Sequence, residues 1–157
     1  RIEWNGPNAE CCIKTTLARQ IANWVIIYSP LQMAADLIEN YEGHPAFRFF
    51  RDFDADCDWS KALQGEIGDY IVVARRAKDR YFLGAGTDEK ARTLVQKLDF
   101  LEPGVTYTAT IYADAPDAGR NPEAYLIGKR AVTARDTIRI EMAERGGQAI
   151  TFIPAEK

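Results

Sequence analysis

Two carboxylates, Asp36 and Glu39, are the residues whose position most favours chemistry. They follow the apolar run Leu31–Ala35 and precede Asn40 and Tyr41. If that run is a strand of a parallel α/β barrel, both side chains lie at its carboxyl-terminal mouth, where the active sites of such barrels are found. Paired carboxylates are the groups that cleave glycosidic bonds. The alternative is that Asp36 caps a helix or holds a loop through hydrogen bonds.

The acidic run from Asp52 to Asp58 suggests a calcium loop at first sight. An EF-hand loop needs Gly at its sixth position and Glu at its twelfth, but counting from Asp52 these positions hold Cys57 and Leu63. His44 is the single histidine of the sequence, so a site built on two imidazoles is excluded. We therefore expect no metal and no cofactor in this chain and interpret the run as a solvated linker.

The cysteines and a pair of glycines also fail the patterns of catalytic motifs. Cys57 stands between two aspartates, whose negative charge disfavours a thiolate, and the adjacent Cys11 and Cys12 lack the Cys-x-x-Cys spacing. The segment Gly84–Gly86 has no third glycine and no following helix, as a dinucleotide loop requires. It is more typical of a strand that another part of the backbone approaches closely.

Four aromatic residues, Trp59, Tyr70, Tyr81 and Tyr107, leave a binding function open. They could form a platform for sugar rings, as in a carbohydrate-binding module. Their alternation with polar residues is more typical of one buried face of a sheet. We therefore expect most of them in the core.

The composition is that of a globular protein and narrows the function classes. The chain has 157 residues, of which 46% are apolar, and a net charge of −3. This charge argues against a broad nucleic-acid surface, and no apolar run reaches the roughly 18 residues of a membrane span. Because the sequence starts at Arg1 without Met or a signal peptide, we expect it to be an excised or processed piece of a longer protein.

The first third of the sequence has a helical period. Apolar residues recur every three or four positions from Ile13 to Tyr28, and Pro30 prevents the helix from continuing. Periodicity does not decide between a short strand and a helical turn for residues 31–37. His44 and Pro45 then indicate the start of a second helix, which continues to about Asp52.

After Trp59 the period changes to two, which predicts strands. Tyr70, Val72 and Ala74 recur at every second position, and apolar and polar residues alternate in 107–111 and 137–142. Turn residues such as Pro103-Gly104 and Gly146-Gly147 separate such segments. Because no helical pattern intervenes, we predict an antiparallel β-sandwich of about seven or eight strands. The predicted fold class is α+β, with a helical part at 1–57 and a β-sandwich at 58–157.

The order of several segments resembles the C-terminal part of glycoside hydrolase family 97. The resemblance begins at Tyr28–Leu37 and continues through Gly65–Tyr70, Thr87–Glu89, Tyr107–Tyr112 and Gly146–Ile150. It covers about residues 14–153. It implies that residues 14–28 form a late helix of a (β/α)8 barrel, Leu31–Ala35 its last strand and residues 45–52 the following helix. Residues 1–57 would then be the partial barrel end and 58–157 the C-terminal oligomerisation sandwich.

The same resemblance implies a function for the whole protein. The family contains bacterial α-glucosidases and α-galactosidases with calcium at the catalytic site. Their catalytic acid, their base or nucleophile and their calcium ligands lie upstream of the matching segment, so no catalytic residue is assigned here. Asp36 and Glu39 stay the candidates at the barrel mouth. This chain alone is expected to lack the catalytic pair.

We therefore expect the C-terminal portion of an α-glycosidase, mainly structural and oligomerising. The alternatives are a non-catalytic carbohydrate-binding module or one chain of a multi-chain glycosidase. Expected partners are the rest of the barrel, an oligosaccharide substrate for the whole enzyme and a second copy, but no nucleic acid and no membrane. Family resemblance implies a periplasmic or secreted protein. The apolar residues Trp24, Ile26, Ile27 and Phe47 should be exposed or covered by another chain.

Overall fold

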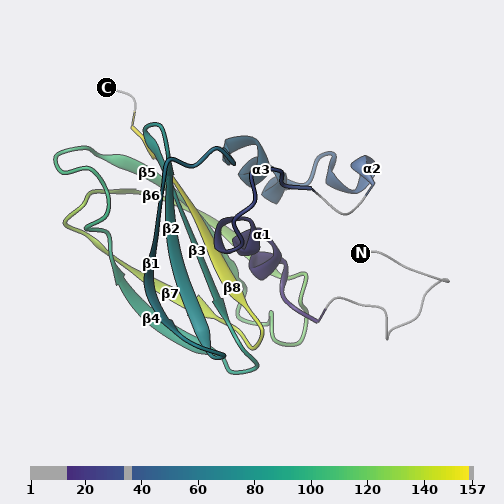
Figure 1. Cartoon of the computed structure of the whole chain (residues 1–157). Coiled ribbons are helices and arrows are strands. Elements are labelled where there is room, and N and C mark those ends of the chain that lie inside the picture. Colours follow the sequence, from purple (N-terminus) through teal and green to yellow (C-terminus); the bar gives the residue numbers. More distant parts are fainter. Residues whose placement is uncertain (1–13, 34–36, 156–157) are drawn as a thin grey trace.

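The fold is a β-sandwich with short helices against one of its outer faces. The computed structural model describes residues 14–33 and 37–155 (Figure 1). Its strands are β1 (Trp59–Glu66), β2 (Tyr70–Ala77), β3 (Arg80–Thr87), β4 (Arg92–Lys97), β5 (Tyr107–Asp114), β6 (Tyr125–Val132), β7 (Thr137–Met142) and β8 (Gly147–Pro154). The predicted α+β class and antiparallel sandwich are confirmed.

The strands form two sheets in which every pair is antiparallel. The larger sheet has the order β1-β2-β3-β8-β5-β6, and the smaller one contains β4 and β7. Tight hairpin turns join β1 to β2 and β2 to β3. Lys78, with φ of 59°, turns the chain between β2 and β3, where the sequence predicts a hairpin.

The main core lies between the two sheets. Alternate residues of each strand point inward, as the period of two predicts, and those of the larger sheet include Leu83, Tyr107 and Phe152. They meet Ile138 and Ile140 of β7 from the opposite sheet. This apolar layer holds the sandwich together.

The helices cover the other face of the larger sheet, away from β4 and β7 (Figure 1). They are α1 (Leu17–Ile26), η2 (Pro45–Phe47) and α3 (Arg48–Asp52), whereas the short α2 (Ile38–Tyr41) lies farther from the sheet and buries no residue. A second apolar cluster joins Ile21 and Val25 of α1 and Phe49 of α3 to Phe82 and Tyr112 of the sheet. The helical segment is therefore attached to the sandwich through its own core.

The first helix is shorter than its hydrophobic period suggests. Thr16 caps its start by accepting a hydrogen bond from the Arg19 backbone N at 3.1 Å, and Ile27 leaves it in an extended conformation. The second predicted helix, at 45–52, appears as η2 followed by α3. None of these elements, within the described ranges, is a helix long and apolar enough to cross a membrane.

The apolar run that was interpreted as the last barrel strand is not a strand where it is described. Residues 31–33 have no strand assignment, and residues 34–36 lie outside the described residues. A strand is stabilised by hydrogen bonds to neighbouring strands. No described strand of this chain pairs with residues 31–33.

Candidate functional site

The two predicted catalytic candidates do not form a site in the described structure. Asp36 lies outside the described residues. Glu39 is exposed in the first turn of α2, between the exposed residues Ile38 and Asn40. An acid–base pair needs two groups held on either side of the bond that is cleaved. Of the two candidates, only Glu39 lies within the described residues, and it lies at the surface.

The carboxylates of the acidic run are separately paired with basic side chains. Lys78 Nζ lies 3.1 Å from Asp54 Oδ2, and Arg76 Nε lies 2.9 Å from Asp58 Oδ1. The hydrogen bond from Lys78 lowers the pKa of Asp54. Across residues 14–33 and 37–155, no group of three or more potential metal ligands gathers. The described acidic side chains thus do not fit a calcium ion, which needs several oxygen ligands.

The side chains of Cys57 and His44 make contacts that hold neighbouring segments of the chain together. The Cys57 thiol is half-buried and donates a hydrogen bond to the Asp54 carbonyl at 3.2 Å, and its burial raises the pKa of the thiol. The His44 ring lies against the Tyr125 ring at 5.4 Å between centroids. The contact joins the segment before η2 to strand β6 and does not bring a second imidazole or an acid to the ring.

The aromatic residues of the sandwich mostly belong to its core. Tyr81 and Tyr107 are buried and meet at right angles, with 5.8 Å between ring centroids. Trp59 packs edge-on against Tyr81, and the Arg92 guanidinium lies 5.1 Å from the centroid of the Tyr70 ring. A platform for sugar rings needs an exposed aromatic face. The buried rings of Tyr81 and Tyr107 therefore cannot be part of such a platform.

An open groove next to α1 is lined partly by charged residues, two of which form ion pairs within the chain. It measures about 800 Å³ and is lined by Arg19, the β1–β2 hairpin and Asp88. Arg92 Nη2 lies 3.0 Å from Asp69 Oδ2 and 3.3 Å from Asp88 Oδ1. These ion pairs fasten the hairpin to the start of β4.

The feature that does require a partner is a run of exposed apolar side chains after α1. We call it the apolar strip; it consists of Ile27, Tyr28, Leu31, Met33, Leu37 and Ile38, each between 61% and 77% exposed. Close by in the sequence, Trp24 of α1 packs against Phe50 of α3 with 4.5 Å between ring centroids. Several exposed apolar side chains on one segment favour an interaction site.

Of the four residues predicted to be exposed or covered by another chain, Ile27 is exposed, whereas Trp24, Ile26 and Phe47 are half-buried. The prediction of exposure holds for Ile27, whereas contacts within the chain cover part of Trp24, Ile26 and Phe47. The body of the helix has a partner within the chain that the sequence did not reveal.

That partner is the glycine-lined outer face of β3 and β8. Ala18, Ile21, Ala22 and Val25 of α1 are buried against it. A Cβ at Gly84 would lie 2.7 Å from the Ala22 carbonyl oxygen and 2.8 Å from the Val25 Cβ. The close approach predicted for Gly84–Gly86 is therefore observed, and the approaching element is α1.

Arg75 of β2 fixes the end of α1, from which the apolar strip begins. Its side chain is buried and donates hydrogen bonds to the carbonyls of Val25 and Ile26, the latter at 3.4 Å. Its guanidinium lies 5.0 Å from the centroid of the Tyr28 ring. A cation at a helix carboxyl terminus is favoured by the helix dipole. The sheet thereby sets the direction in which the strip leaves the helix.

The other end of α1 is held by Arg19 and by the β7–β8 turn, in which the Arg145 carbonyl accepts a hydrogen bond from the Thr16 backbone N at 3.4 Å. Arg19 Nη1 donates a hydrogen bond to the Thr87 carbonyl at 2.8 Å, and burial lowers the pKa of this side chain. Asp114 Oδ2 accepts hydrogen bonds from the Ala143 and Gly147 backbone N–H groups at 2.9 and 3.0 Å, and burial raises the pKa of Asp114. Both helix ends are thus tied to the sandwich.

These anchoring arginines are the functional residues that sequence reasoning missed. Arg75 shares one face of β2 with the apolar residues Val73 and Ala77, but nothing in the sequence showed that a helix end lies above it. Long-range contacts of this kind, between residues 49 or 50 positions apart, leave no local pattern.

Comparison with known proteins gives the chain its relatives. Residues 56–153 match the family model described as "Glycosyl-hydrolase 97 C-terminal, oligomerisation". The curated retaining alpha-galactosidase of Bacteroides thetaiotaomicron is 32% identical over 136 residues, which are 86% of this chain and 20% of that protein. The chain thus spans about a fifth of the length of this relative.

The chain is also similar to parts of solved glycosidase structures. A glycoside hydrolase family 97 enzyme of Pseudoalteromonas sp. strain K8, solved in complex with acarbose and with panose, is 46% identical, with a TM-score of 0.87. The match covers 91% of this chain and 23% of that enzyme. A beta-arabinopyranosidase shares the fold at 24% identity, with a TM-score of 0.72 over 87% of this chain and 21% of that one.

Proposed function

Because the chain belongs to glycoside hydrolase family 97, we propose that it is the C-terminal portion of a longer bacterial α-glycosidase. In that enzyme it is mainly structural and oligomerising, and the whole protein hydrolyses α-glucosides or α-galactosides. The relative that is named a retaining alpha-galactosidase and the Pseudoalteromonas enzyme that holds acarbose or panose support this substrate class. Residues 1–57 supply the end of the catalytic barrel, and residues 58–157 are the C-terminal sandwich.

The apolar strip is the observation that carries this proposal. Its six side chains lie on the segment that leaves α1, and both ends of α1 are fastened to the sandwich. Burial of such side chains stabilises an interface by about 25 cal/mol for each Å² of apolar surface removed from water. The occupant we propose is the remainder of the barrel, in the same polypeptide or in a partner chain.

The chemistry of the whole enzyme comes from residues outside this chain. Among the described carboxylates, Asp54 and Asp58 pair with Lys78 and Arg76, Asp114 is held by backbone N–H groups, and Glu39 lies at the surface. Asp36 and Glu39 stay the candidates at the barrel mouth, and we assign neither of them a catalytic role. Calcium at the catalytic site of the whole enzyme would be held elsewhere, and a periplasmic or secreted location follows from the family resemblance alone.

A chimaeric enzyme tests this docking role. The region of the Pseudoalteromonas enzyme that matches this chain is replaced by the chain, in its natural form or with Leu31→Asp and Met33→Asp. Charges placed in an apolar interface are costly, so the double variant is expected to lose most of its soluble, active enzyme.

The matched control for the chimaera is Val95→Asp, on an equally exposed apolar residue of β4. This variant should leave activity and yield unchanged. If the strip variant is as stable and as active as the control, the strip does not dock on the barrel.

A further inference from the structure

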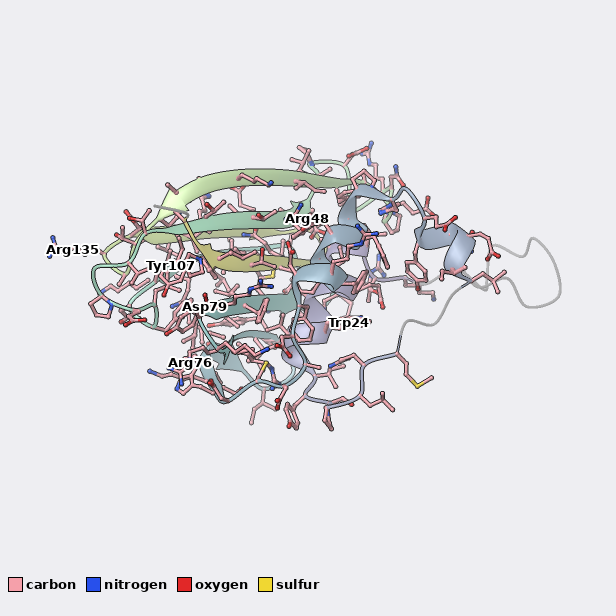
Figure 2. The ribbon with its side chains drawn as sticks, turned by 90° about the horizontal axis from the view of Figure 1, so that it is seen from above. Trp24, Arg48, Arg76, Asp79, Tyr107 and Arg135 are labelled. Carbon is pink, nitrogen blue, oxygen red and sulfur yellow. The ribbon has the colours of Figure 1, made fainter. Side chains whose placement is uncertain are left out.

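The six-stranded sheet ends in two very different edge strands. The register between β1 and β2 shifts between Ala62 and Gln64, and such a bulge hinders pairing with a further strand. Strand β6 instead pairs with β5 in unbroken register from Tyr125 to Val132. On its other side, β6 pairs with no strand of the described chain and lies along one margin of the sheet (Figure 2).

The residues of β6 are those of a strand that another chain approaches. Leu126 and Ile127 are 55% and 40% exposed. Gly128 follows them without a left-handed φ, and a Cβ placed on it would meet no atom within 4 Å. Neither its conformation nor its packing in this chain therefore requires glycine. A glycine inside a strand often marks the close approach of another backbone.

We propose that β6 pairs antiparallel with β6 of a second copy of this chain, with the two-fold axis at Gly128. The proposal rests on the proposed oligomerising role and names the surface that performs it. The family description, which specifies oligomerisation for residues 56–153, points to a second copy as the occupant. An interface on a two-fold axis uses the same strand from both subunits, and edge-strand addition supplies its backbone hydrogen bonds.

The positively charged residues of β6 favour the register with the two-fold axis at Gly128. Centring the pair on Gly128 places Lys129 opposite Ile127 and Arg130 opposite Leu126, so no like charges face each other directly. Centring it on Lys129 would oppose two ammonium groups, and directly opposed like charges destabilise a sheet. Centring it on Ile127 would pair a shorter part of the strand.

The Gly128→Cys variant tests the axis, in a chain whose natural cysteines are replaced by alanine. Opposed residues in antiparallel strands have Cα atoms about 4.5–5.5 Å apart, within the range of a disulfide. Mild oxidation should convert most of this variant into a covalent dimer, and the unoxidised chain should have twice the monomer mass in sedimentation. The control is Val95→Cys, which is exposed on the other sheet and should stay uncross-linked.

A second pair of variants tests the register. Ile127→Lys would face Lys129 of the other copy, whereas Ile127→Glu would form an ion pair with it, so the dissociation constant should be higher for the lysine variant.

A dimer in which Gly128→Cys does not cross-link, or in which Val95→Cys cross-links equally, would overturn the β6 interface and leave the oligomerising role intact. A chain that is monomeric throughout the micromolar range would overturn both.

Discussion

Gly84 determines how closely α1 can approach the sheet. The neighbouring atoms are the backbone oxygen of Ala22 and the Cβ of Val25, and neither can move without shifting the helix. Its role therefore differs from that of a glycine selected for an unusual turn, because it gives space to another element.

The Gly84→Ala variant should be less stable by about 1–3 kcal/mol, the usual cost of adding atoms to a packed interior. The added Cβ would lie 2.7 Å from the Ala22 oxygen and force α1 outward. Urea unfolding followed by tryptophan fluorescence measures this change. Gly119→Ala is the control, because a Cβ there meets no atom within 4 Å, and it should change stability by less than about 0.5 kcal/mol. Equal stability of the two variants would contradict the contact.

Asp136 makes the β6–β7 turn sensitive to acid. Its Oδ2 accepts hydrogen bonds from the Thr133 backbone N and hydroxyl at 2.6 and 2.9 Å, and these bonds lower the pKa of Asp136. A carboxyl whose pKa is lower in the folded state stabilises the fold above its unfolded pKa, and this contribution disappears as the pH falls through the folded pKa.

The natural chain should therefore melt at a higher temperature than Asp136→Asn at neutral pH. The difference should shrink below about pH 4, where an ordinary aspartate begins to take up a proton. Thermal unfolding of both proteins between neutral and acidic pH measures the difference. A constant difference over the whole titration would show that ionisation of Asp136 does not stabilise the turn.

At the scale of elements, α1 is the connection between the sandwich and the apolar strip. Its buried face lies against β3 and β8 (Figure 1). Arg19 holds its start and Arg75 its end. A strip that projects from a helix fixed in this way is presented in a defined direction. Such pre-organisation reduces the entropy lost on docking.

The Arg75→Met variant should cost about 1–3 kcal/mol, because it leaves the Val25 and Ile26 carbonyls without their buried donor. Hydrogen exchange should show less protection of the α1 amides, with β3 little changed. Arg139→Met is the control, because the pair of Arg139 with Glu141 is exposed at the surface and contributes at most about 1 kcal/mol. Similar protection of α1 in both variants would contradict the anchoring role of Arg75.

The same scale explains what could be predicted from the sequence. Strand β7 was predictable because one of its faces is buried, so apolar and polar residues alternate along it. The position of α1 on the sheet could not be predicted, because it depends on Gly84, Arg75 and a sheet face assembled from distant segments. The failure of the Asp52–Asp58 run to match a calcium loop could be read from the sequence, but the ion pairs of Asp58 with Arg76 and of Asp54 with Lys78 were visible only in the structure.

The candidate catalytic site could be predicted less well, for a related reason. Asp36 and Glu39 were selected because the apolar run before them has the pattern of a barrel strand. A barrel strand is defined by its neighbours, and the described chain provides none for residues 31–33. Two residues of that run, Leu31 and Met33, instead belong to the apolar strip.

For the whole molecule, the sandwich is complete in itself and the apolar strip is not. The sandwich has a core between its sheets and a second one beneath α1, whereas the strip faces solvent. This contrast is what we expect of a part of an enzyme that stabilises and assembles a catalytic domain without supplying the reacting groups.

The most direct measurement is hydrolysis of 4-nitrophenyl α-glucoside and α-galactoside by the isolated chain and by the chimaera that contains it. Glycosidic cleavage needs an acid and a second carboxylate on either side of the bond, and the described part of this chain brings no such pair together. We predict no turnover above background for the chain alone and turnover of one of the two substrates by the chimaera. Turnover by the isolated chain that disappears in both Asp36→Asn and Glu39→Gln would contradict this account, because it would place the catalytic pair within these 157 residues.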